Sequence, residues 1–141
     1  MKTYKYMIIF FVKIILRNGL KESSELTMHN VFRNLKRITK KSPYITFKSS
    51  LDKAKVYSEI KSVKISGRNY KVPVEIKPRR QLSLVFKWMT FNSSKVGNYT
   101  KDISLMKELL NTCVFNSKTI KKCNDFHKIA ESNKIYMHYR Y

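Results

Sequence analysis

The feature that most constrains the fold is a change of hydrophobic period in the middle of the chain. Over residues 60–65 and again over residues 70–77, apolar and polar side chains alternate with a period of two, which is typical of β-strands. A turn segment containing Gly67 separates the runs, so the sequence predicts a β-hairpin at about residues 58–77. Because Pro73 cannot donate to a ladder, its strand needs a free edge. We therefore expect a protruding two-stranded ribbon that rests on helices or on a partner.

Helical spacing of apolar residues surrounds this ribbon. It predicts helices ending near Gly19 and spanning about residues 27–39, 44–55 and 100–114. Pro78 suits the first position of another helix, and Asp125 suits the N-cap of the last one. The last helix would place Phe126, Ile129, Ala130, Asn133 and Met137 on one face. The sequence thus predicts a mainly α fold, with about six helices and one hairpin, and 141 residues fit a single domain, 1–141.

The N-terminus contains an apolar run, Met7 to Val12, preceded by two lysines. A signal peptide is one interpretation, but Arg17-Asn18-Gly19 follows where a small-residue cleavage site would be required. The run is also too short to span a bilayer. The pattern favours a buried first helix. An Arg-rich and Ser-rich transit peptide is not visible either, so a protein of this kind working in an organelle would be made there.

The charge balance restricts the class of partner. The chain has 30 Lys and Arg residues against 9 Asp and Glu, a formal net charge of +21. A folded protein this basic is expected beside a dense polyanion, either nucleic acid or an anionic membrane. Phe, Tyr, Met, Ile, Asn and Lys are abundant and there are only 3 glycines and 3 prolines. This bias indicates an AT-rich genome, so codon supply explains part of the lysine content.

Groups that could support catalysis are scattered. The acids occur singly, and Cys113, Cys123, His127 and His138 do not have the spacing of a usual zinc site. With so few glycines there is no phosphate-cradling loop. We expect Cys113 to be a small core residue and His29 to be a solvated or core-edge imidazole. The prediction is therefore no enzyme activity, no metal and no cofactor, with two thiols that are reduced or form one bridge.

Basic residues gather in three clusters, which become candidate nucleic-acid contacts. The hairpin and its exit carry Lys61, Lys64, Arg68, Lys71, Lys77, Arg79 and Arg80. The C-terminal region carries Lys121, Lys122, Lys128, Lys134 and Arg140. The third cluster contains Arg17, Lys21, Arg33, Lys36 and Arg37. Cations on separate elements indicate a broad footprint wrapped by a polyanion. Tyr70, Tyr136 and Tyr139 could stack on unpaired bases, although core packing is favoured for Tyr70.

The hairpin and the C-terminus also carry specific motifs. Residues 70–78 read YKVPVEIKP, and Arg80 and Trp88 follow. Residues 125–141 read DFHKIAESNKIYMHYRY. These blocks resemble the patterns GGxxYQVPVEVxPxRR and DVHKMAEANRAFAHYRW of the small-subunit ribosomal protein seven family. The same family is matched at Lys13 with Arg17-Asn18-Gly19, at Glu108-Leu109-Leu110 and at Lys121-Lys122. The resemblance covers about residues 11–141.

Several positions depart from the family pattern. Ser66 replaces the first turn glycine, Gln81 a second arginine and Tyr141 a terminal tryptophan. The larger residues Val85, Met106 and Met137 stand where the family commonly has alanine. We therefore expect an altered hairpin turn, and either helices set further apart or a refilled core.

The resemblance implies a structural protein that organises RNA in the head of the small ribosomal subunit, with its ribbon near the exit site for tRNA and mRNA. By position, Lys64, Arg68 and Lys71 would approach the exit site. The residues implied to meet rRNA phosphates are Arg79, Arg80, Lys122, Lys128 and Arg140. The C-terminal helix would face the platform near small-subunit protein eleven.

Other classes of function remain open from the sequence. One is a free-standing RNA- or DNA-binding regulator, and another is a secreted, cationic, membrane-active protein. The ribosomal interpretation includes no membrane partner. It favours the mitochondrial matrix, with a plastid or a bacterial cytoplasm as alternatives.

Overall fold

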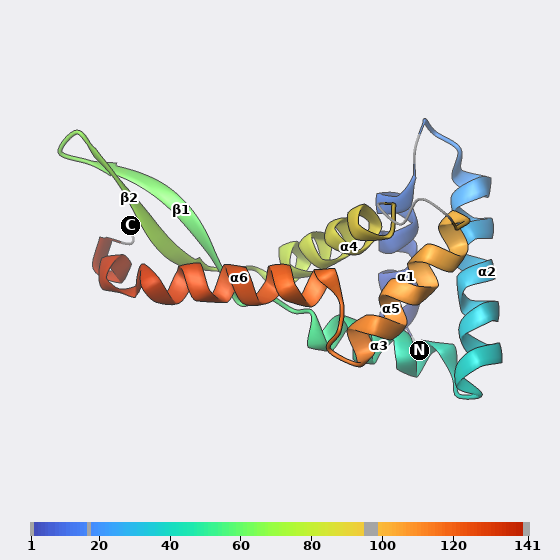
Figure 1. Ribbon diagram of the computed structural model, residues 1–141. Helices are drawn as coiled ribbons and strands as arrows, with labels where there is room; N and C mark the ends of the chain where they lie inside the picture. Colours follow the sequence, from blue (N-terminus) through green and yellow to red (C-terminus); the bar gives the residue numbers. More distant parts are fainter. Residues whose placement is uncertain (1, 17, 95–98, 140–141) are drawn as a thin grey trace.

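The computed structural model describes residues 2–16, 18–94 and 99–139 (Figure 1). Its elements are α1 (Lys2–Ile15), α2 (Lys21–Thr39), α3 (Pro43–Lys53), β1 (Ser58–Ile65), β2 (Arg68–Glu75), α4 (Pro78–Ser94), α5 (Lys101–Cys113), α6 (Lys118–Ser132) and the 3-10 helix η1 (Lys134–Tyr139). The predicted fold class, mainly α with one hairpin between helices, is confirmed. In Figure 1, α1 to α5 form a helical body, and the hairpin extends away from it with α6 running along the same direction.

Helices α1 to α5 share one hydrophobic core. Its centre is an aromatic stack in which the ring of Phe11 lies 4.4 Å from Phe86 and 5.8 Å from Phe47. All three side chains are almost fully buried, and each such pair adds about 0.5–1.5 kcal/mol beyond burial. The apolar N-terminal run therefore forms a first helix that packs into the core, as predicted, although α1 ends at Ile15 and not near Gly19. Val85 and Met106 are also in this core, so larger side chains fill positions where alanine was expected.

Helix α2 begins at Lys21, six residues earlier than predicted. Residues 21–26 are helical but fall outside the apolar pattern, because the inward positions here carry hydroxyl side chains. Ser24 donates to the carbonyl of Leu20, and Thr27 donates to that of Ser23 at 2.9 Å. Ser24 and Thr27 are buried, so they continue the inward face although neither is apolar.

The prediction that Asp125 caps the last helix is wrong, because α6 begins at Lys118. Its N-cap is Ser117, whose Oγ accepts from the N–H of Ile120 at 3.1 Å. From α5, Oε1 of the buried Glu108 accepts from the N–H and Oγ1 of Thr119, at 3.2 and 2.6 Å. A carboxylate at this position also complements the helix dipole. This corner fixes the direction in which α6 leaves the body.

The C-terminal end of α6 also differs from the prediction. The side-chain amide of Asn133 donates to the carbonyl of Ile129 at 2.7 Å, and the chain then continues as the 3-10 helix η1. Met137 therefore does not share a face of α6 with Ala130. It lies on η1 with 39% of its surface exposed.

The hairpin is confirmed, and β2 begins at Arg68, two residues nearer the turn than the alternation over residues 70–77 showed. Ile65 pairs with Arg68, which leaves only Ser66 and Gly67 in the loop. Their φ angles are 49° and 83°, the positive values that two-residue type I′ turns require. Ser66 thus adopts a left-handed conformation where the family resemblance has glycine. Pro73 pairs with Ile60 in a sheet of two strands, so the expected free edge is present.

The ribbon rests on the C-terminal elements, as expected for a hairpin of marginal intrinsic stability. Tyr70 lies 5.4 Å from Tyr136 and 5.2 Å from Tyr139, both on η1. Tyr70 therefore packs, as favoured, but in this small cluster and not in the main core. At the base of the ribbon, Val56 and Ile76 join Cys123 of α6 in a second buried cluster.

Candidate nucleic-acid interface

The two faces of the ribbon carry different side chains. Lys64 pairs with Asn69, and Ser62 pairs with Lys71, so Lys64 and Lys71 are diagonal neighbours on one face. Both are exposed. The other face holds Lys61, Arg68 and the apolar residues that pack toward η1. The part of the first face nearest the turn is thus exposed and cationic, while Pro73 on the same face is buried nearer the base. Arg68 directly follows the turn at the tip.

Three cations stand where the ribbon enters α4. Lys77 precedes the helix, while Arg79 and Arg80 occupy its first turn, and all are exposed. Cations at a helix N-terminus oppose the helix dipole, so this placement reduces stability unless an anion is bound. Arg80 is engaged in part, since its Nε donates to Oε2 of Glu59 at 2.7 Å. Arg79 and Lys77 make no ion pair within the described residues.

Helix α6 presents Lys121 and Lys128 to solvent seven residues apart, hence on one face. Asp125 lies between them on that face, and Lys118, which the sequence analysis did not select, lies one turn before Lys121. Lys122 is half-buried, and its Nζ lies 4.4 Å from the ring centroid of Phe91 on α4. Lys122 therefore helps to hold α6 against α4. Lys134 is exposed at the start of η1.

The described residues of the third predicted cluster do not all lie together in the structure. Lys21 lies at the start of α2 and pairs with Glu25 at 3.6 Å on an exposed surface, an interaction of small energetic weight. Arg33, Lys36 and Arg37 lie three or more turns further along the same helix. Arg17 and Arg140 lie outside the described residues.

The remaining candidates lie toward one end of the molecule. Helix α6 packs against β1 and against α4, so the ribbon, the start of α4 and the C-terminal elements lie at one end of the molecule. In Figure 1, α2 lies at the opposite end of the helical body. We call the end that carries the ribbon the ribbon surface; its cations are Lys61, Lys64, Arg68, Lys71, Lys77, Arg79, Lys121, Lys128 and Lys134. The sequence alone did not predict that these segments lie together, because their proximity depends on the corner between α5 and α6.

The two cysteines and His127, whose spacing does not fit a usual zinc site, make contacts within the fold. Burial raises the pKa of the Cys123 thiol, and it raises that of Cys113 despite the opposing charge of Lys53. Both thiols are free and stay protonated at neutral pH, which makes them poor nucleophiles. Cys113 is half-buried at the core edge, and its thiol donates to the carbonyl of Thr46 at 3.4 Å. His127 accepts from the N–H of Tyr57 at 3.4 Å.

Among the described residues, no group of three or more His, Cys, Asp or Glu side chains could hold a metal ion. Likewise, among the helices of residues 2–16, 18–94 and 99–139, none has the length and apolar character needed to cross a membrane.

Comparison with known proteins assigns the class. Residues 2–134 match the family described as ribosomal protein S7p/S5e. The small ribosomal subunit protein uS7m of Reclinomonas americana is 33% identical over 135 residues, covering 96% of this chain and 85% of that protein. The uS7 proteins of Laribacter hongkongensis and Myxococcus xanthus are 31% and 34% identical over 131 residues, each covering 93% of this chain and 84% of the relative.

The chain is therefore a ribosomal protein of the small subunit, built as a helical body with a basic ribbon. It belongs to the ribosomal protein S7p/S5e family. Its role is structural and not enzymatic, and the resemblance seen in residues 70–78 and 125–141 is confirmed.

Proposed function

We propose that this protein binds and organises the rRNA of the small-subunit head through its ribbon surface. The observation that carries the proposal is the convergence of exposed cations from three separate elements at one end of the molecule. Lys64 and Lys71 come from the ribbon, Lys77 and Arg79 from the start of α4, and Lys128 from α6. Each cation that meets a phosphate releases counterions, so the unfavourable self-repulsion of the free protein becomes a source of affinity.

The ribbon has the shape for a second role near the exit site for tRNA and mRNA. The face with Lys64 and Lys71 is exposed near the turn, the ribbon is two strands wide, and Arg68 lies at its tip. A thin cationic arm of this kind reaches between RNA elements that a helical body cannot approach. Lys64, Arg68 and Lys71 are proposed to contact RNA there, while Arg79 and Lys128 serve head rRNA. Arg80 is 60% exposed and is proposed to meet rRNA while it also pairs with Glu59, whereas Lys122 is engaged with Phe91.

The C-terminal elements are proposed to contact a neighbouring ribosomal protein as well. Ile129, Ile135 and Met137 are 46%, 76% and 39% exposed, so α6 and η1 present three large apolar side chains to solvent. These side chains support a protein contact, which we assign to platform protein eleven. The mitochondrial relative and the compositional bias toward AT-rich codons support the mitochondrial ribosome as the setting.

Co-sedimentation tests the assignment. The protein should travel with small subunits through a sucrose gradient at moderate salt. Its affinity for isolated head-domain RNA should fall by about 10³-fold between 50 and 200 mM salt if about six phosphates are contacted. A free pool that does not enter small subunits would instead indicate an independent RNA- or DNA-binding regulator, and a flat salt response would contradict the phosphate contacts.

A further inference from the structure

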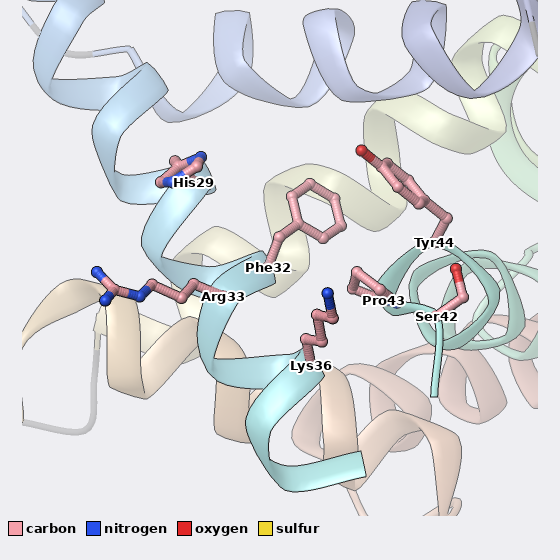
Figure 2. A pocket seen from close by; sticks show the side chains of 7 residues that line it. All are labelled: His29, Phe32, Arg33, Lys36, Ser42, Pro43 and Tyr44. Atoms are coloured by element: carbon pink, nitrogen blue, oxygen red, sulfur yellow. The ribbon is translucent and has the colours of Figure 1, made fainter. Parts of the chain in front are cut away.

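A pocket of about 690 Å³ opens on the helical body, between α2 and α3 and away from the ribbon surface. It is lined by His29, Phe32, Arg33, Lys36, Ser42, Pro43 and Tyr44. Figure 2 shows the ring of Phe32 between His29 and Tyr44, with the Lys36 side chain directed toward Phe32 and Pro43. We call it the α2–α3 pocket. None of its lining residues belongs to the ribbon surface.

The pocket has an aromatic wall with one fixed ring and one exposed ring. Phe32 is held from behind by Phe47, whose ring lies 5.6 Å away at 74°. The ring of Tyr44 lies 5.3 Å from Phe32, tilted by 36°. Tyr44 is 49% exposed, so it presents a planar surface to a ligand. The packing behind Phe32 means that this wall is formed before any ligand arrives.

The rest of the lining carries positive charge without an acidic residue. His29, Arg33 and Lys36 follow one another at helical spacing on α2 and so lie on one side of that helix. In the part of the chain that the structure describes, neither Arg33 nor Lys36 forms an ion pair. Lys36 therefore remains available beside the aromatic wall, while Arg33 lines the pocket further along α2 with its side chain directed away from Tyr44 (Figure 2). Together they suit a ligand that has a planar group and more than one phosphate.

We propose that the α2–α3 pocket binds one unpaired nucleotide of RNA. The base stacks on Tyr44 and the edge of Phe32, and the adjoining phosphates meet Lys36 and Arg33. Single-stranded RNA is recognised by this combination of aromatic stacking and cationic backbone contacts. An acidic peptide would satisfy the cations but leave the Tyr44 face without a planar partner. The inference rests on the proposed RNA-binding function, and it adds a second contact on a different side of the body.

Photocrosslinking of the full chain tests the pocket at residue level. The probe is octauridine RNA containing one 4-thiouridine, and crosslinked peptides are mapped by mass spectrometry. We expect a crosslink at Phe32 or Tyr44 that falls about 10-fold when Arg33→Gln and Lys36→Gln are combined. The matched control combines Arg37→Gln with Lys41→Gln, which removes the same charge from exposed positions outside the pocket. The control should retain the crosslink within 2-fold.

A second pair of variants isolates the stacking contribution. Tyr44→Ala should weaken octauridine binding at the pocket about 10-fold, within the range that stacking on one base provides. Ile45→Ala, at a neighbouring residue that is 65% exposed and outside the pocket, should not. Circular dichroism melting of all variants confirms that they are folded. Tyr44→Phe should restore binding, since it keeps the planar ring.

Three results would overturn the inference. The first is a set of crosslinks confined to the ribbon surface. The second is an equal loss of crosslinking or binding in the pocket variants and their controls. In purified small subunits, a photoreactive group at position 44 that labels a protein and not RNA would assign the pocket to a protein contact. If the pocket crosslink persists but the chain fails to sediment with small subunits, the ribosomal assignment fails and the nucleotide site stands.

Discussion

The helical body and the ribbon are stabilised in different ways. The body is held by fully buried rings such as Phe11, Phe47 and Phe86, with polar groups satisfied at its α5–α6 corner. The ribbon has two strands, a few buried residues such as Val72 and a partly exposed tyrosine cluster. The ribbon instead exposes its cations, Lys61, Lys64, Arg68 and Lys71, to solvent. Stability should therefore respond to substitutions in the body, and RNA affinity to substitutions on the ribbon surface.

The largest effect is expected in the body. Phe86→Ala removes a ring that stacks on Phe11 and Phe47 and should lower the free energy of unfolding by about 3–5 kcal/mol. Urea denaturation followed by circular dichroism measures the loss. Tyr57→Ala, at a 64% exposed ring, is the comparison and should cost far less. Similar losses in both variants would mean that the aromatic stack is not the centre of the core.

A smaller loss of stability is expected at the α5–α6 corner, which sets the direction of α6. Glu108→Gln keeps an oxygen that can accept from Thr119 but removes its negative charge from the start of α6. The loss of charge-assisted hydrogen bonds predicts about 1–2 kcal/mol of destabilisation. Hydrogen exchange should accelerate in the first turn of α6 before it does in α1. Glu131→Gln, an exposed control on the same helix, should change neither measurement, and unchanged exchange in the Glu108 variant would contradict the capping role.

At the junction of body and ribbon, affinity should change while stability does not. Lys77→Gln combined with Arg79→Gln should weaken binding to head-domain RNA about 10-fold and reduce the salt slope by nearly 2. Because both side chains are exposed and oppose the dipole of α4, the free energy of unfolding should stay within about 0.5 kcal/mol of the original or rise slightly. A loss of stability equal to the loss of affinity would show that the two regions are not separable here.

Arg80 must be treated apart from its neighbour. Its pairing with Glu59, which is only 12% exposed, joins α4 to β1, so Arg80→Ala should reduce both affinity and the order of the ribbon. The comparison of Arg79→Ala with Arg80→Ala at fixed salt distinguishes a purely RNA-facing cation from one that also positions the ribbon. Hydrogen exchange in β1 should rise only in the Arg80 variant, and a rise in both would remove the distinction.

The sequence predicted what depends on local pattern and missed what depends on contacts between distant segments. Alternation, Gly67 and Pro73 were enough for the hairpin. The start of α2 was missed because Ser24 and Thr27 bond to their own helix and pack inward without being apolar. The start of α6 was missed because half of its cap comes from Glu108, on another helix.

The candidate site was likewise predicted only in part. Cationic residue types were visible in the sequence, and most of the selected residues lie on one surface. Lys21 was wrongly grouped with the end of α2, since helix length separates residues that look clustered along the chain. The α2–α3 pocket could not be found from spacing alone, because Tyr44 reaches it from the next helix. Arg33 and Lys36 at helical spacing were the available signal.

The smallest effect is expected at the tip of the ribbon. Arg68→Ala removes an exposed cation next to the turn and breaks no ion pair seen among the described residues. Small subunits should therefore assemble at normal levels in sucrose gradients, while tRNA occupancy or mRNA stability at the exit site decreases by a few-fold. Ser66→Gly is a useful companion, because it relieves the left-handed strain at φ 49° without changing charge. It should stabilise the turn and leave exit-site function intact. Complete loss of small subunits in the Arg68 variant would show that the tip serves assembly. The separation between a stable body and a functional ribbon would then fail at the residue where it should be clearest.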